Sequence, residues 1–133
     1  MISANAVWVG KERFVGIAGS RHSVVIDAAS SEKSASSPME LVLIGLCGCT
    51  ATDVVSILQK KRELFTALEV RAEADQGPEP PRVYTHIRLI YKVRGNVTKK
   101  AMEDAVRLSK EKYCSVSAML EKTATITFKI EYE

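Results

Sequence analysis

The 133-residue chain carries little excess charge of either sign. Its formal net charge at pH 7 is +3, from 19 basic and 16 acidic residues, and no arginine-rich run with interleaved aromatic residues occurs. Surfaces that bind nucleic acid are strongly basic, so no nucleic-acid partner is expected. The first residues, MISANAVWVG, lack the positively charged and then apolar order of a secretory signal, which predicts a cytoplasmic location.

Cysteine and histidine are also scarce. Three cysteines are an odd number and do not describe the disulfide framework of a small secreted protein. In a reducing compartment they are free thiols, metal ligands or redox groups. The two histidines, His22 and His86, stand apart on strand-like stretches, whereas a zinc site needs about four Cys or His ligands at fixed spacing. No phosphate-binding glycine loop, dinucleotide fingerprint or serine-hydrolase elbow is present, so we expect neither metal nor cofactor.

The longest apolar block runs from Ser37 to Arg62 and predicts one long helix. Ser37 suits the N-cap, Pro38 suits the first helical position, and Glu40 completes a capping box. Apolar residues fall on nearly every face of the first half, so we expect that half to be buried all round. Glu40 and Asp53 leave an apolar run shorter than the roughly 20 residues a bilayer needs, and no membrane span is expected. About 25 helical residues would extend roughly 37 Å, which predicts a central rod wrapped by a sheet.

Alternating apolar and polar residues predict strands on both sides of this helix. The predicted strands cover 4–9, 13–18, 22–27, 65–74, 82–94 and 123–132, and the predicted helices cover 37–62, 98–112 and a short segment after Cys114. The first three strands suggest an antiparallel meander, and the next two a hairpin. The order βββ–α–ββ–α–(α)–β predicts one α+β domain over residues 1–133.

Cys47 and Cys49 lie two residues apart, which separates their side chains by about 200° around a helix. At most one of them can therefore share a site with Cys114. Cys49 lies on a stripe of small and polar residues and Cys47 on the apolar side, so we favour Cys49 as the functional thiol. Cys114 lies between two predicted helices, and the positive end of the following helix is expected to lower its pKa. For each cysteine the alternative is a small, inert apolar residue.

The segment SPMELVLIGLCGCTATDVVSILQKKR (37–62) together with KYCSVSAMLEK (112–122) resembles the OsmC/Ohr family of thiol-dependent peroxidases, and in particular its YhfA-like branch. The first segment is similar to the family's central helix, with a small-small-Cys element that ends at Cys49. The second is similar to its second-cysteine motif. The resemblance covers nearly the whole chain. It implies an OsmC-like intertwined homodimer, in which antiparallel six-stranded sheets wrap around two long central helices.

The resemblance also implies a reaction with an organic hydroperoxide. The Cys49 thiolate would attack the peroxide O–O bond and become a sulfenic acid. Cys114 would then condense with it to a disulfide, which an external dithiol reduces. An apolar pocket around the thiol favours organic hydroperoxides over hydrogen peroxide. The alternative function is a non-catalytic module that binds an apolar ligand at the same dimer interface.

A glutamate and an arginine assist the thiol in this family, in a site at the dimer interface. Glu40 matches the glutamate, although its capping role explains its presence equally well. Arg13 is the nearest candidate for the arginine, and Lys11 and Arg21 are the alternatives. A cation at this place would offset the cost of desolvating the thiolate.

Overall fold

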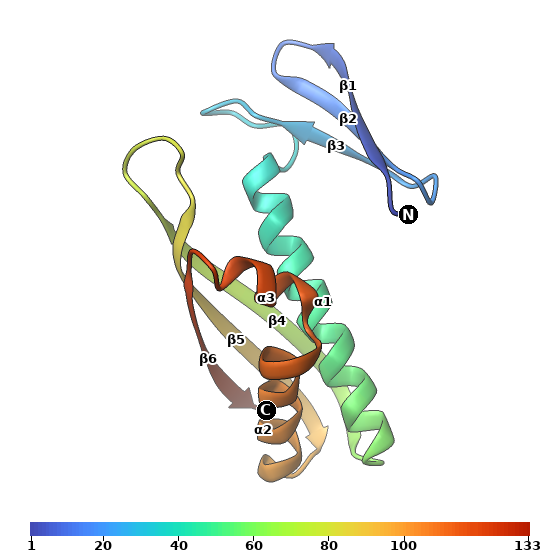
Figure 1. Ribbon diagram of the computed structural model, residues 1–133. Helices are drawn as coiled ribbons and strands as arrows, with labels where there is room; N and C mark the ends of the chain where they lie inside the picture. The colour runs from blue at the N-terminus through green and yellow to red at the C-terminus, as the bar shows by residue number, and fades with distance from the viewer. The chain divides into compact units, whose positions relative to one another are not determined.

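The computed structural model describes residues 1–133, and its elements follow the order that the sequence predicts. The elements are β1 (Ala4–Gly10), β2 (Arg13–Ala18), β3 (Ser23–Asp27), α1 (Pro38–Lys60), β4 (Leu64–Gln76), β5 (Tyr84–Asn96), α2 (Lys99–Leu108), a π-helical turn η1 (Ser109–Tyr113), α3 (Ser115–Leu120) and β6 (Thr125–Tyr132). Figure 1 shows these helices and strands, which confirm the α+β class. The chain divides into two compact units, Met1–Leu43 and Ile44–Glu133. A single domain over the whole chain stays a prediction.

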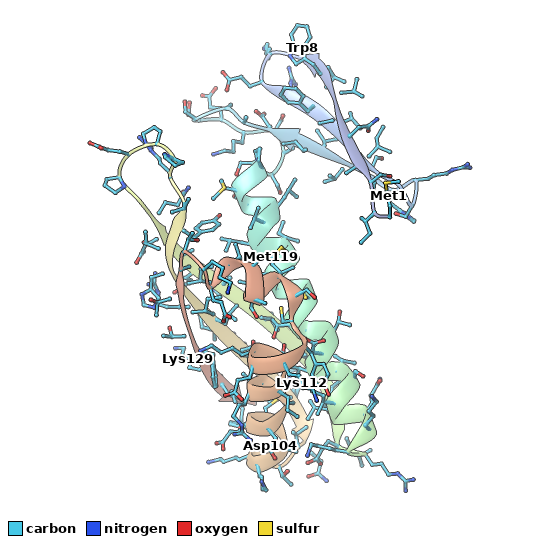
Figure 2. All side chains as sticks on the ribbon, in the orientation of Figure 1. Met1, Trp8, Asp104, Lys112, Met119 and Lys129 are labelled. Atoms are coloured by element: carbon cyan, nitrogen blue, oxygen red, sulfur yellow. The ribbon has the colours of Figure 1, made fainter.

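The amino-terminal unit holds the predicted antiparallel meander β1–β2–β3. Lys11 takes a left-handed conformation (φ 49°) in the turn between β1 and β2, and its carbonyl accepts a hydrogen bond from Nε1 of Trp8 (2.8 Å). Figure 2 labels Trp8, which is 65% exposed. Every residue of β1 before Gly10 is exposed, so this strand has no buried face within the single chain.

The start of α1 confirms the predicted capping box. The backbone N–H of Ser37 donates to Oε1 of Glu40 (2.9 Å), and the N–H of Glu40 donates to Oγ of Ser37 (3.1 Å). These two bonds satisfy donors that the first turn of a helix leaves free. The helix ends at Lys60, and Arg62 follows in a left-handed conformation (φ 58°).

One stripe of α1 is buried within the chain. Its residues recur at four-residue spacing: Leu46, Thr50, Val54 and Leu58. The prediction that the first half of the helix is buried all round is wrong for the single chain, because Ile44 is 57% exposed and Val42 36% exposed. A three-stranded sheet covers one side of a helix, and the remaining apolar side chains of α1 need another surface to bury them.

The length and composition of α1 alone would allow it to cross a membrane, so the expected shortness of its apolar run does not exclude a span. This is weak evidence, because core helices of soluble proteins have the same length and composition. Thr50 on α1 is hydrogen-bonded to Tyr91 on β5 (2.7 Å). The helix therefore packs against its own sheet, and the absence of a membrane span stays a prediction.

The second unit contains the sheet β4–β5–β6. The predicted hairpin is confirmed, since β4 and β5 pair antiparallel. The prediction of antiparallel sheets is wrong for the last pair, since β6 runs parallel to β5. The crossover through α2, η1 and α3 explains this, because it returns the chain to the end of the sheet where β5 begins. Alternate residues of β5 are buried against the helices, namely Ile87, Leu89, Tyr91 and Val93.

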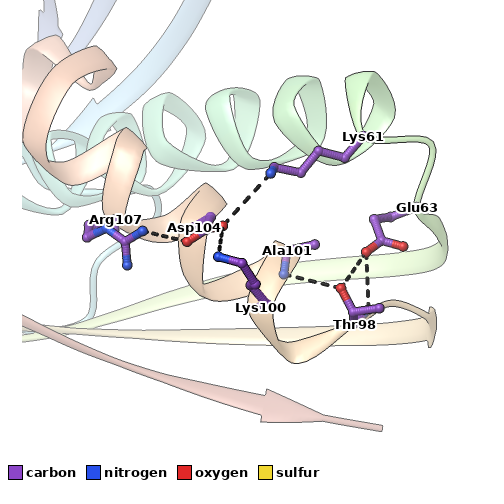
Figure 3. A network of polar contacts seen from close by, with 7 residues as sticks. All are labelled: Lys61, Glu63, Thr98, Lys100, Ala101, Asp104 and Arg107. Carbon is purple, nitrogen blue, oxygen red and sulfur yellow. Dashed lines mark hydrogen bonds and ion pairs between the residues drawn. The ribbon is translucent and has the colours of Figure 1, made fainter.

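A polar network joins the end of α1 to the start of α2 (Figure 3). Thr98, the first residue of the predicted helix 98–112, caps α2 by accepting a hydrogen bond from the N–H of Ala101 (3.2 Å). Its own hydroxyl donates to Glu63, just beyond α1 (2.6 Å). The carboxylate of Asp104 pairs with three cations, Lys61, Lys100 and Arg107. These contacts hold α2 beside α1 and so place the segment that follows α2.

Candidate functional site

The second unit brings Cys49 of α1 and Cys114 together. Their thiols lie close enough for Cys49 to raise the pKa of Cys114, and all three cysteines of the chain are free. Cys114 is 2% exposed and Cys49 is half-buried. The structure therefore pairs Cys114 with the thiol that helical spacing favoured. The catalytic role of this pair stays a prediction.

The π-helical turn η1 places Cys114. A regular helix was predicted to reach residue 112, but α2 ends at Leu108 and the chain widens over Ser109–Tyr113. The turn is closed by the N–H of Cys114, which donates to the carbonyl of Ser109 (2.8 Å). Single π-turns of this kind often occur at functional sites. Cys114 then adopts an extended conformation and caps α3, where its Sγ accepts the N–H of Ser117 (3.4 Å).

Burial raises the pKa of the Cys114 thiol. The N–H of Ser117 lowers this pKa, as predicted for the start of a following helix, but desolvation is the larger effect and the contact with Cys49 raises the pKa further. The prediction of an easily ionised Cys114 is therefore wrong. One hydrogen bond from a short helix does not offset the removal of the thiol from water. Cys114 is therefore suited to keep its proton at neutral pH.

Cys47 is half-buried on α1, and burial raises its pKa. Its thiolate would be a small fraction at neutral pH, so it is a poor nucleophile. This agrees with the packing role that its place on the apolar side of the helix predicts.

A buried chain of hydroxyl groups lies near the thiols, and the sequence reasoning did not find it. Oη of Tyr91 lies 2.7 Å from Oγ1 of Thr50, which lies 2.8 Å from Oγ of Ser109. Ser109 in turn donates to Oδ2 of Asp53 (2.8 Å). The three hydroxyl residues are at most 2% exposed, and burial raises the pKa of Tyr91 to about 12. The one sequence signal was Thr50, a polar residue on an otherwise apolar stripe.

Glu40 and Arg13 belong to the amino-terminal unit. The hydrogen bonds with Ser37 lower the pKa of Glu40, so its carboxylate is charged in its capping role. Arg13 is half-buried and aligned with Asp27 of β3, whose carboxylate it stabilises electrostatically. The alternatives Lys11 and Arg21 are exposed and occupy left-handed positions in turns (φ 49° and 69°). A role for any of these residues beside Cys49 stays a prediction.

Residues 1–133 contain no group of three or more His, Cys, Asp or Glu side chains that could hold a metal ion. Nδ1 of His22 bonds with the hydroxyl of Ser20 (3.0 Å), and Nε2 of His86 bonds with that of Thr127 (3.2 Å). The groups described at the candidate site are the two neighbouring thiols and the chain of hydroxyl groups.

Comparison with known proteins shows which family this chain resembles in sequence and in fold. The model of the family described as OsmC-like protein matches residues 31–129. Protein YhfA of Escherichia coli strain K12 is 45% identical over 131 residues, which cover 98% of this chain and 97% of YhfA. A protein of Aquifex aeolicus VF5 with a solved structure is 27% identical with a TM-score of 0.86, over 100% of this chain and 98% of its own.

A more distant solved structure shares the fold. The organic hydroperoxide resistance protein of Elizabethkingia anophelis is 13% identical with a TM-score of 0.79, over 100% of this chain and 96% of its own. The family model and the identity with YhfA together confirm the resemblance seen in the two cysteine segments. The chain therefore belongs to the OsmC/Ohr family of OsmC-like proteins.

Proposed function

We propose that this protein is a thiol-dependent peroxidase that reduces organic hydroperoxides. The observation that carries the proposal is the proximity of the thiols of Cys49 and Cys114, which come from distant parts of the sequence. Membership of the OsmC/Ohr family supports it. Two solved proteins of this fold, from Elizabethkingia anophelis and Legionella pneumophila, are named organic hydroperoxide resistance proteins.

In the first step the Cys49 thiolate attacks the terminal oxygen of the hydroperoxide. The O–O bond breaks, the sulfur is oxidised to a sulfenic acid, and the alkoxide takes up a proton and leaves as an alcohol. Cys49 suits this role because it is half-buried, which gives peroxide access and limits further oxidation.

In the second step Cys114 attacks the sulfenic sulfur of Cys49. The S–S bond forms, the S–O bond breaks, and the hydroxide leaves as water with the proton of Cys114. The raised pKa of Cys114 suits a thiol that keeps its proton until this step. An external dithiol then reduces the disulfide by exchange and restores both thiols.

A homodimer would complete the site. The apolar residues of α1 that the single chain leaves exposed, and the strand β1 without a buried face, support a second copy that covers them. We place Glu40 and Arg13 at this interface, with Lys11 and Arg21 as alternatives to Arg13. A cation there would stabilise the thiolate of Cys49. A cytoplasmic location accords with the three free thiols.

The test is one stoichiometric dose of cumene hydroperoxide, followed by thiol counting and peptide mass spectrometry. Rapid loss of two thiols per chain is expected, with a Cys49–Cys114 crosslink inside one chain. Cys47→Ser serves as the control and should behave as the natural protein does. Absence of rapid thiol loss would overturn the proposal. Comparing the second-order rates with cumene hydroperoxide and hydrogen peroxide then tests the preference for organic substrates, which equal rates would contradict.

One observation favours a second function, a non-catalytic module that binds an apolar ligand at the dimer interface. Apolar side chains of α1, such as Val42 and Ile44, remain exposed in the single chain and would suit an apolar ligand. Under the same peroxide dose, this alternative predicts no rapid thiol loss, or slow loss at all three cysteines.

A further inference from the structure

The buried hydroxyl chain joins the two segments that carry the paired thiols. Thr50 follows Cys49 directly on α1, and its hydroxyl bonds with that of Ser109 (2.8 Å). The carbonyl of Ser109 accepts the N–H of Cys114 (2.8 Å). Ser109 therefore connects α1 through its side chain to Cys114 through its backbone. Any shift of η1 away from α1 must break one of these two bonds.

Asp53 fixes the donor-to-acceptor direction of the hydrogen bonds along the buried hydroxyl chain. A carboxylate can only accept hydrogen bonds, so the Ser109 hydroxyl donates its hydrogen bond to Asp53. Ser109 must then accept from Thr50, and Thr50 from Tyr91, because each hydroxyl has one proton. A hydrogen bond to a charged group is stronger than a neutral one, and each link polarises the next. One arrangement of the four side chains satisfies every donor.

The two ends of the chain differ in exposure. Tyr91 is 1% exposed. The nearby thiols of Cys114 and Cys47 contribute electrostatically to the raised pKa of its hydroxyl. Asp53 is half-buried and lines a hollow of about 320 Å³, together with Lys60, Lys61 and other residues. The chain thus runs from the core beside the thiols to a solvent-accessible carboxylate.

We propose that Thr50, Ser109 and Asp53 are positioning residues that hold the sulfur atoms of Cys49 and Cys114 close together. They set how readily the disulfide forms, and they do not take part in the attack of Cys49 on the peroxide. This inference rests on the proposed function for its place in a peroxidase cycle, whereas the positioning of the two sulfur atoms can be tested without peroxide. Holding two groups in reactive geometry raises their effective concentration, which a small displacement lowers steeply.

The test is the equilibrium between the reduced full-length protein and oxidised dithiothreitol, without peroxide. Two protein thiols are oxidised to one disulfide, and one dithiothreitol disulfide is reduced to two thiols. Thr50→Val should lower the equilibrium constant by about tenfold or more. Thr50→Ser keeps the hydroxyl and should stay within about twofold of the natural protein.

Thr52→Val is the matched control. Thr52 lies on the same helix, is exposed, and bonds with the carbonyl of Gly48 (2.7 Å), outside the hydroxyl chain. This variant should leave the equilibrium constant unchanged. Ser109→Ala and Asp53→Ala test the other links, and Asp53→Ala keeps the test open if the buried variants fail to fold. Circular dichroism identifies the folded variants.

Kinetics provide a second readout. After rapid mixing with cumene hydroperoxide, the variants should form the Cys49 sulfenic acid at the natural rate but close the disulfide about tenfold more slowly. A natural equilibrium constant in folded Thr50→Val or Asp53→Ala would overturn the positioning role. If the constants fall as expected but even the natural protein does not consume peroxide, the peroxidase proposal fails and the positioning role stands.

Discussion

The backbone N–H of Cys114 donates to the carbonyl of Ser109 across a bond that spans five residues (2.8 Å). A regular helix would close its turns over four residues, so the extra residue of η1 changes the direction in which Cys114 leaves α2. The same turn brings the side chain of Ser109 to Thr50 on α1 (2.8 Å).

The two paired thiols should fail in different ways when each is replaced. Cys49→Ser should abolish peroxide consumption, because the attacking sulfur is lost. Cys114→Ser should still form one sulfenic acid per chain, which a dimedone adduct would reveal by mass spectrometry, but it should not form an intramolecular disulfide. Should Cys47→Ser prove inactive while Cys49→Ser remains active, the assignment of the two helix cysteines would be reversed.

The two possible roles of Glu40 can be separated with Glu40→Gln. A glutamine at this position also forms a capping box with Ser37, so the free energy of unfolding in urea should change by less than about 1 kcal/mol. If the charge of Glu40 assists Cys49, peroxide consumption should fall by about tenfold or more. Full activity in the folded variant would leave Glu40 with its capping role alone.

Asp27 should make stability depend on pH at the acid end. Backbone N–H groups of Ser34 and Ala29 and the Ser34 hydroxyl lower its pKa from 3.8 to about 2. Because the pKa is lower in the folded state, this contribution is complete above the unfolded value of 3.8 and is lost as pH falls towards 2.

Asp27→Asn is the variant that tests this effect. It should be less stable than the natural protein at pH 7, and the difference should shrink as pH falls from about 4 to 2. Urea unfolding at a series of pH values measures it. A difference that stays constant across this range would show that the charge of Asp27 contributes nothing.

Ile44 should report on the proposed dimer. Its side chain is 57% exposed in the single chain, so Ile44→Glu removes little buried surface within one copy. If a second copy covers this face of α1, the glutamate would place an unpaired charge in an apolar interface, which is strongly unfavourable. Sedimentation velocity should show loss of the dimer. Gln59→Glu, an exposed change at the polar end of the same helix, is the control and should sediment as the natural protein does.

The strand over 123–132 was predicted correctly, but the expected antiparallel direction was wrong for β6, for a physical reason. Period-two alternation over 123–132 identifies a strand and its two faces. This alternation does not show which strand pairs with β6 or in which direction β6 runs. Both depend on the end of the sheet to which α2, η1 and α3 return the chain. The burial of Cys114 shows the same limit, because the cost of desolvating its thiol depends on side chains that surround it in space.

Local sequence patterns by themselves determined the secondary structure of this protein and part of its candidate site. The element order, the capping box of Ser37 and Glu40, and the separation of Cys47 from Cys49 around α1 all follow from interactions between residues close in the sequence. Tertiary structure alone decided the π-turn, the raised pKa of Cys114 and the chain from Tyr91 to Asp53. Each of these depends on which distant side chains meet in the core and exclude water, and short-range periodicity does not encode those contacts.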